Sequence, residues 1–98
     1  MYSQTIEIDG ISVTFYRTNC DYYGNPRYIV HFLDFLSIDE AHRLSIDEGY
    51  ALAHRRAKSI GFYKYRGKNF GGGFVGSSYS IQEDARHIVA MIKGEERY

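Results

Sequence analysis

The sequence predicts an α+β fold, in which helices pack on one face of a small, mostly antiparallel β-sheet. Three observations lead to this prediction. The chain has 98 residues, the length of one domain, so we expect residues 1–98 to share a single core. Strand-like patterns come first and helical patterns are interspersed later, in the order β-β-β-α-β-β-α. An Asp-Gly pair between the first two strands is typical of a tight antiparallel hairpin.

The first hairpin is predicted around Asp9-Gly10, in the stretch TIEIDGISVTFYR. Asp-Gly favours a two-residue type I′ turn, which fixes how the two strands pair. In that register, alternate residues point to the same side of the hairpin. The side that they share is apolar and carries Ile6, Ile8, Ile11, Val13 and Phe15.

A third strand is predicted over residues 27–36, RYIVHFLDFL. It follows a second turn, which is rich in Asn, Asp, Gly and Pro. Its residues are apolar on both faces, which indicates a central strand covered by a helix on at least one side.

Two helix starts are predicted from the repeated motif LSIDE at residues 36–40 and 44–48. In each copy a Ser is followed three residues later by a Glu, the pattern of a capping box. Apolar residues recur at helical spacing after the second copy, but the stripe does not extend back through the first. We therefore expect a short helical turn at 38–44 and a longer helix at 46–60, ended by Gly61.

The last part of the chain is predicted to form two strands and a helix. Residues 62–66 and 70–79 have extended patterns, with a turn at 66–69 between them. A final helix is expected to begin after Ser80 and to end at Gly94. Residues 95–98 are expected to fray.

A glycine run, NFGGGFVGSS, contains the spacing Gly-x-Gly-x-x-Gly at Gly71, Gly73 and Gly76. A dinucleotide site would need a second parallel strand after the following helix, and a phosphate-binding loop of the Walker type would need a lysine. Neither is present, and the RNA-recognition consensus matches only in part. We interpret the run as backbone geometry: a bend, a close approach of another segment, or a residue with positive φ.

Charge is unevenly distributed along a chain whose net charge is zero. Residues 1–48 hold three basic and eight acidic residues, whereas residues 49–82 hold six basic residues and no acidic one. Two interpretations remain open: an anionic partner for the basic segment, or acidic and basic segments that face each other in the fold.

The basic segment is a candidate binding surface because aromatic residues are interleaved with its cations. Cations beside stacking rings are typical of proteins that bind single-stranded nucleic acid. Lys64 and Arg66 would lie on the opposite strand face from Tyr63 and Tyr65, however, which also fits a solvated face above packed tyrosines. The candidate residues of this segment are Arg55, Arg56, Lys58, Lys64, Tyr65, Arg66 and Lys68.

A second candidate surface is the turn CDYYGNPRY, which places Tyr22 and Tyr23 at a hairpin tip, with Arg27 following. Two adjacent tyrosines on a loop are difficult to bury together, so we expect one of them to be presented to a partner. The alternative is that their rings pack on the edge of the sheet.

Reactive groups are sparse. The single cysteine, Cys20, excludes an internal disulfide and a cysteine-based zinc site, and no pair of histidines has metal-ligand spacing. We predict no cofactor, no metal and no enzymatic activity. The sequence shows no signal peptide and no membrane-spanning stretch, so a cytoplasmic protein is expected.

The stretches YYGNPRYIVHFLDFL and YRGKNFGGGFVGSSYS resemble those of small accessory proteins of phages and plasmids. Some compact, tyrosine-rich proteins of this kind are anti-defence inhibitors, including anti-CRISPR proteins. The resemblance implies a non-catalytic, stoichiometric inhibitor of a host macromolecule, most simply a protein such as a nucleic-acid-processing or CRISPR complex. The alternative is a module that binds single-stranded DNA or RNA through residues 55–70.

Overall fold

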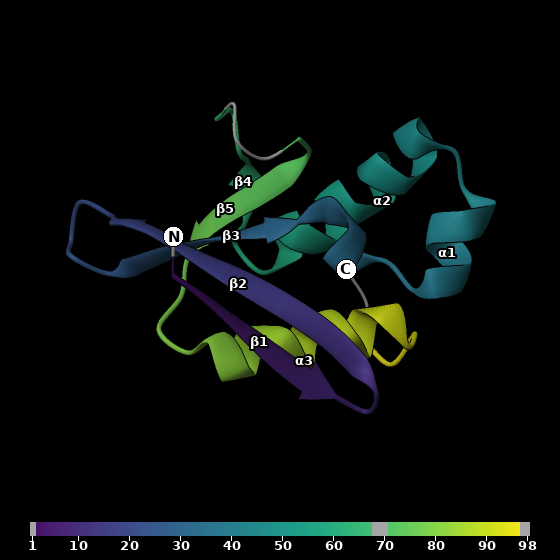
Figure 1. Ribbon diagram of the computed structural model, residues 1–98, viewed down its shortest axis with the longest axis horizontal. Coiled ribbons are helices and arrows are strands. Elements are labelled where there is room, and N and C mark those ends of the chain that lie inside the picture. The colour runs from purple at the N-terminus through teal and green to yellow at the C-terminus, as the bar shows by residue number, and fades with distance from the viewer. Residues whose placement is uncertain (1, 68–70, 97–98) are drawn as a thin grey trace.

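The computed structural model describes residues 2–67 and 71–96 and confirms the α+β fold. Its five strands form one sheet in the order β1-β2-β3-β5-β4, and every neighbouring pair is antiparallel (Figure 1). The strands are β1 (Ser3–Ile8), β2 (Ile11–Cys20), β3 (Pro26–His31), β4 (Tyr63–Lys64) and β5 (Gly73–Ser77). The helices are the 3₁₀ turn η1 (Phe32–Phe35), α1 (Ile38–Arg43), α2 (Ile46–Ser59) and α3 (Ile81–Ile92).

The β1–β2 hairpin has the predicted turn and register. Asp9 and Gly10 both have positive φ, 52° and 79°, as a type I′ turn requires. Ile6 pairs with Val13 and Ile8 with Ile11, so the apolar side chains share one face. The hairpin therefore brings the apolar face of both strands to the core.

The third strand is central, as predicted, but it ends at His31 rather than continuing to residue 36. Residues 32–35 form η1, whose start is capped by the His31 ring through the Leu33 N–H. A continuous apolar run has no periodicity that separates a strand from a helical turn, so the pattern alone extended the strand too far.

Both capping boxes form, and they start α1 and α2 where predicted. In each box the Ser hydroxyl accepts a hydrogen bond from the N–H of the Glu three residues on, and the Glu carboxylate accepts one from the N–H of the Ser. Gly61, with a φ of 83°, follows the end of α2.

The second half of the sheet is shorter than predicted. Strand β4 covers only two residues, although the N–H of Tyr65 continues the pairing by donating to the Gly73 carbonyl. Residues 68 and 69 of the expected turn lie outside the described residues. Strand β5 begins at Gly73, within the glycine run.

The glycine run has the geometric role that we expected of it. Gly72 has a φ of 85°. At Gly76, an added Cβ would lie 2.8 Å from the Phe62 ring and 2.9 Å from the Gly61 carbonyl oxygen. The absence of a side chain at Gly76 thus lets the segment that follows α2 lie directly on β5.

Helix α3 begins after Ser80, whose hydroxyl accepts a hydrogen bond from the Glu83 N–H, and Gly94 ends it with a φ of 77°. The described tail does not fray as expected. The N–H of Glu95 donates to the Ala90 carbonyl, and the Glu96 carboxylate lies 2.8 Å from Nδ1 of His87. These contacts fold residues 95 and 96 back onto α3.

The core lies between the sheet and the two longer helices. In Figure 1, α3 lies behind β1 and β2, and α1 projects to one side. The buried residues come from inward-facing positions of the strands, from η1 and the segment after α2, and from one stripe of each helix: Val13, Phe15, Val30, Phe35, Ala53, Ala57, Phe62, Phe74, Ala85, Ile88 and Val89. No helix among the described residues is long and apolar enough to cross a membrane.

Candidate partner-binding surfaces

The loop between β2 and β3, residues 21–25, is organised by Asp21; we call it the tyrosine loop. Oδ1 of Asp21 accepts hydrogen bonds from the backbone N–H groups of Tyr23, at 2.9 Å, and Asn25, at 2.8 Å. The Asp21 N–H donates to the Asn25 carbonyl, and Gly24 takes a φ of 83° to complete the turn. A short Asp side chain favours this geometry because it reaches backbone N–H groups two to four residues on.

The tyrosine loop is also tied to strand β5. Oδ2 of Asp21 accepts hydrogen bonds from the Ser77 hydroxyl, at 2.8 Å, and from the side-chain amide of Asn25, at 3.2 Å. The Ser77 hydrogen bond is the largest cause that lowers the pKa of Asp21, and the bonds from Asn25 and Tyr23 add to it. The carboxylate therefore stays ionised and holds four donors at neutral pH.

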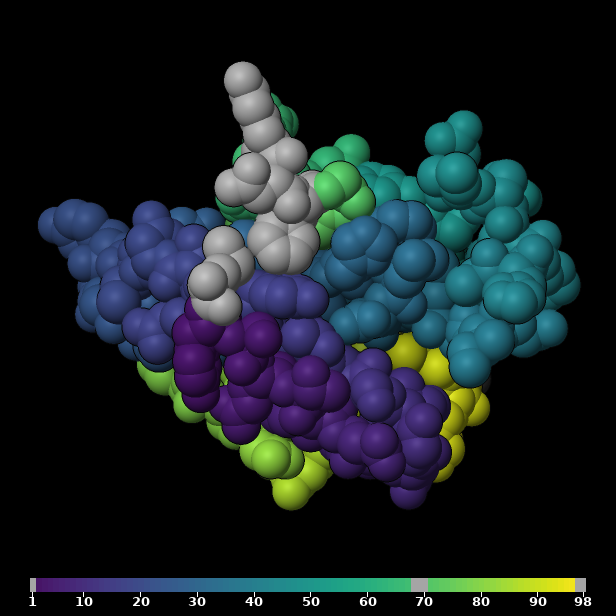
Figure 2. Space-filling model, viewed as in Figure 1, coloured from purple at the N-terminus to yellow at the C-terminus, as the bar shows by residue number. Residues whose placement is uncertain are grey.

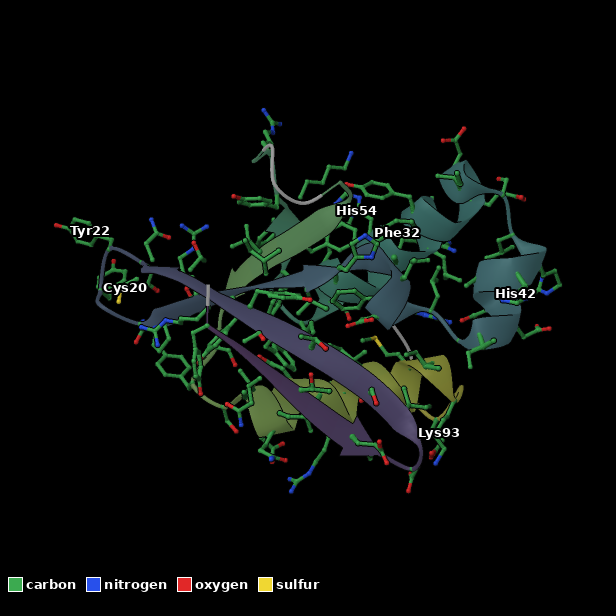
Figure 3. All side chains as sticks on the ribbon, viewed as in Figure 1. Cys20, Tyr22, Phe32, His42, His54 and Lys93 are labelled. Atoms are coloured by element: carbon green, nitrogen blue, oxygen red, sulfur yellow. The ribbon has the colours of Figure 1, made fainter. Side chains whose placement is uncertain are left out.

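Three tyrosines project into solvent from this region. Tyr22 is 94% exposed and Tyr23 83% exposed, and their rings meet edge to face with centroids 5.2 Å apart. Tyr79, which is 88% exposed, accepts a hydrogen bond at its hydroxyl from the Asn25 amide. Figure 3 shows Tyr22 directed away from the sheet, at one end of the molecule. We call Tyr22, Tyr23 and Tyr79 the tyrosine patch.

Tyr79 is not among the binding residues predicted from the sequence, although the sequence contains a signal for it. Tyr79 directly precedes the cap of α3, where an apolar residue usually packs against the fourth residue of the helix. That residue is Asp84, which is polar and offers no apolar contact. The mismatch indicates that the ring at position 79 turns toward solvent.

Arg27 lies beside the tyrosine loop, in β3, where it is half-buried and pairs in register with Ser77. Alternation along the strands places Arg27 and Tyr63 on the sheet face opposite the helices. Tyr63 is 61% exposed on that face.

Exposed basic residues of α2, of β4 and of the segment that follows β4 provide a second candidate surface. Arg55 and Lys58 are exposed on one side of α2, and the ammonium of Lys64 lies 5.7 Å from the centre of the Tyr50 ring. Within the described part of the chain, these side chains and Arg66 form no ion pair. We call Arg55, Lys58, Lys64 and Arg66 the basic patch.

His54 connects the basic patch to the core. Its ring stacks on Phe74, with centroids 5.6 Å apart and planes 3° from parallel. Burial lowers the pKa of His54, and the charges of Lys58 and Lys64 lower it further. Lys58 of α2 and Lys64 of β4 thus both lie near the His54 ring, so the two parts of the basic patch are neighbours.

Arg56 does not belong to this surface, which corrects the expectation that it contacts a partner. It is only 4% exposed, and its guanidinium is held by both oxygens of Glu40, at 2.8 Å, and by the Phe35 carbonyl, at 2.7 Å. The hydrogen bond from Arg56 is the largest cause that lowers the pKa of Glu40. Position 56 lies three residues after Ala53 and one before Ala57, so it falls on the buried side of α2.

Of the two remaining candidates, one is half-buried and the other is not among the residues that the structure describes. Tyr65 is half-buried, and its ring lies so close to Gly67 that an added Cβ would overlap it. Lys68 lies outside the described residues.

The tyrosine patch and the basic patch occupy separate places on the molecule, since Tyr22 and His54 lie well apart in Figure 3.

The described residues include no cluster of three or more His, Cys, Asp and Glu side chains that could hold a metal ion. Cys20 is exposed next to the tyrosine loop, and a guanidinium nitrogen of Arg17 lies 3.6 Å from its sulfur. Residues three apart in a regular strand point to opposite faces, and Arg17 reaches Cys20 because the pairing of β2 with β3 is irregular between these two residues.

A family model described as Staphylococcus phage terminal repeat-encoded protein TreK matches residues 5–98. Comparison with curated proteins and with solved structures gave no match. The family match supports the phage part of the resemblance noted in the sequence and does not extend to an anti-CRISPR protein. Because the match covers nearly the whole chain, this protein belongs to the family of Staphylococcus phage terminal repeat-encoded protein TreK.

Proposed function

We propose that this phage protein is a non-catalytic binding protein that blocks a protein of the host cell, and that it docks through the tyrosine patch. The observation behind the proposal is that Tyr22 and Tyr23 are exposed on a loop held by hydrogen bonds, and that the exposed Tyr79 is joined to this loop through Asn25. Tyrosine is enriched at the energetic centres of protein interfaces because its ring is large and apolar while its hydroxyl still forms hydrogen bonds.

The fixed loop strengthens this proposal. Fixing the backbone of one flexible residue costs roughly 1–2 kcal/mol. Four hydrogen bonds to the carboxylate of Asp21 set the loop before any partner arrives, so less of that cost remains to be met on binding. A tyrosine carried on a backbone that is already ordered binds with a smaller loss of entropy.

The phage origin directs the proposal toward a partner in the infected bacterium, in its cytoplasm. The excess of acidic residues in the first 48 residues would favour a partner with a basic surface and speed docking to it. Nucleases and CRISPR complexes are partners of this kind, because they carry basic grooves for nucleic acid.

Affinity capture from a staphylococcal lysate tests the proposal. We expect the wild-type chain to retain a specific host protein and the Tyr22→Ala/Tyr23→Ala variant to bind it about 100-fold more weakly, since interface tyrosines often contribute about 2 kcal/mol or more. Tyr63→Ala is the matched control, because it removes an exposed tyrosine from β4 instead, and it should bind as the wild type does. Equal binding by the double variant and the wild type would refute docking through the tyrosine patch.

Inhibition needs a separate measurement. The captured protein is purified, and its own activity is assayed with increasing amounts of the wild-type chain and of the double variant. We expect activity to fall to its minimum near an equimolar ratio with the wild-type chain only. Continued full activity at saturation would show binding without inhibition.

The second candidate function is binding of single-stranded DNA or RNA by the basic patch. It is favoured by the four cations of the patch, which form no ion pair among the described residues. Such binding weakens steeply as salt rises. In a gel-shift assay at low salt, the wild-type chain should reduce the electrophoretic mobility of labelled single-stranded oligonucleotides. The Lys58→Gln/Lys64→Gln variant should bind less of the oligonucleotide. Arg86→Gln, which removes a cation from α3 instead, should bind as the wild type does. No shift with the wild type would exclude this function.

A further inference from the structure

An apolar groove of about 420 Å³ lies where the β1–β2 hairpin, the η1–α1 segment and the end of α3 meet. This volume is within the range of small-ligand sites, about 300–1,000 Å³. Figure 2 shows yellow atoms of α3 between the blue-violet hairpin and the teal segment above it. The groove is lined mainly by the aliphatic side chains of Ile11, Leu33, Leu36, Ile38 and Ile92, together with Asp34.

The aliphatic wall of the groove is open to solvent. Ile38 is 81% exposed, and α1 contributes no buried residue to the core. Packing of the fold therefore gives no reason for an isoleucine at this position. Leu36, which is buried, forms the apolar floor beside it.

Asp34 is the one charged residue among those that line the groove. Its Oδ2 accepts a hydrogen bond from the Thr14 N–H, at 2.9 Å, where β3 has turned into η1 and no longer pairs with β2. Its other oxygen has no hydrogen-bond partner among the described residues. Burial raises the pKa of Asp34, so a cation placed beside this oxygen would stabilise the ionised carboxylate.

The surroundings of the groove favour a cation over an anion. No Lys or Arg lines it. Lys93 directly follows the lining residue Ile92, but its ammonium is already paired with Asp9, at 2.8 Å, and Glu95, at 3.2 Å. His31 is the one basic residue whose charge is seen to act on Asp34 among the described residues, where it lowers the pKa that burial raises. A bound cation would thus meet the carboxylate of Asp34 with no Lys or Arg of the lining beside it.

We propose that this groove binds a peptide segment of a partner in which a bulky aliphatic residue stands next to Arg or Lys. The aliphatic side chain lies against Ile38 and Leu36, and the cation lies beside Asp34. The groove and Tyr22 lie at different ends of the molecule, as the positions of Lys93 and Tyr22 in Figure 3 indicate. This second docking site is independent of the tyrosine patch.

Titration of the full ¹⁵N-labelled chain with two capped dipeptides tests the proposal. The probes are N-acetyl-Leu-Arg-amide and N-acetyl-Leu-Glu-amide. We expect the Arg peptide to shift the amide signals of Ile11, Asp34, Ile38 and Ile92 with a dissociation constant of about 1–10 mM, as suits a small fragment. No shift of these signals at about 10 mM, or equal binding of the Glu peptide, would overturn the proposal.

Two variants separate the apolar and the charged contributions. Ile38→Ser should weaken binding of the Arg peptide by about threefold to tenfold. Ile46→Ser is its matched control, because Ile46 occupies the same position after the second capping box, is as exposed, and does not line the groove. Asp34→Asn keeps an acceptor for the Thr14 N–H and should abolish the preference for Arg over Glu. An equal loss in Ile46→Ser, or an unchanged preference in a folded Asp34→Asn variant, would contradict the assignment.

Discussion

At the scale of single residues, Asp21 is the residue on which the geometry of the tyrosine patch depends. Its two carboxylate oxygens accept hydrogen bonds from the backbone of the loop, the Asn25 amide and the Ser77 hydroxyl. Asn25 in turn donates to the hydroxyl of Tyr79. One ionised side chain thus links the hairpin tip, strand β5 and the third tyrosine.

Ser77→Ala should raise the pKa of Asp21 toward its ordinary value, because the Ser77 hydrogen bond is the largest cause of its lowering. A group whose pKa is lowered by folding stabilises the protein above its unfolded-state pKa. That stabilisation is lost as the pH falls through the folded-state pKa. The measurement is an NMR titration of the Asp21 carboxyl carbon in the wild type and the variant. Identical titration curves would show that Ser77 does not set the charge of the loop.

At the scale of elements, the ion pair between Arg56 and Glu40 joins α2 to α1 and to the end of η1. Glu40 serves twice: its Oε1 accepts the Ser37 N–H of the capping box and also the guanidinium of Arg56. Helix α1 has no buried side chain of its own among the described residues. Its position therefore depends strongly on this contact.

Arg56→Ala should lower the free energy of unfolding by about 3 kcal/mol, because it leaves a largely buried carboxylate and the Phe35 carbonyl without their donor. Arg55→Ala, one position away on the exposed side of α2, should change it by less than about 0.5 kcal/mol. Urea unfolding followed by circular dichroism measures both. Similar effects of the two substitutions would contradict the structural role of Arg56.

The contact between β5 and the segment after α2 depends on Gly76. Gly76→Ala should destabilise the protein by about 1–3 kcal/mol, since the new methyl group meets both the Phe62 ring and the backbone oxygen of Gly61. Gly71→Ala is the matched control: its Cβ would meet nothing within 4 Å among the described residues. Thermal unfolding compares the two, and an unchanged melting temperature for Gly76→Ala would refute the close approach.

The elements that local rules determine were predictable from the sequence. Asp9-Gly10 sets the hairpin register, and the two Ser-x-x-Glu boxes start α1 and α2 at the expected residues. The end of β3 was not predictable, because the Asp34–Thr14 and Phe32–Gly72 hydrogen bonds that redirect residues 32–35 join positions far apart in the sequence. Arg56 was misassigned for a related reason. Its charge indicated a solvent-exposed side chain, whereas its partner Glu40 lies 16 residues away on another helix.

At the scale of the whole molecule, the sequence indicated that Tyr22 and Tyr23 lie at an exposed hairpin tip, but it did not indicate which side chains lie beside them. Tyr22 and Tyr23 could be selected from composition and turn signals alone. Tyr79 joins them only because Ser77 and Asn25 bring β5 beside the tyrosine loop. The result is a chain that displays separate aromatic, basic and apolar surfaces, which is consistent with a protein that acts by binding.

Site-specific photocrosslinking in phage-infected staphylococci tests most directly the claim that this protein acts through its tyrosine patch. A photoreactive phenylalanine analogue is placed at position 22, and as a control at position 42, which lies at the opposite end of the molecule in Figure 3. We expect irradiation to yield one dominant adduct with a host protein from position 22 and none from position 42. No adduct from position 22, or the same adduct in equal yield from position 42, would refute docking through the tyrosine patch.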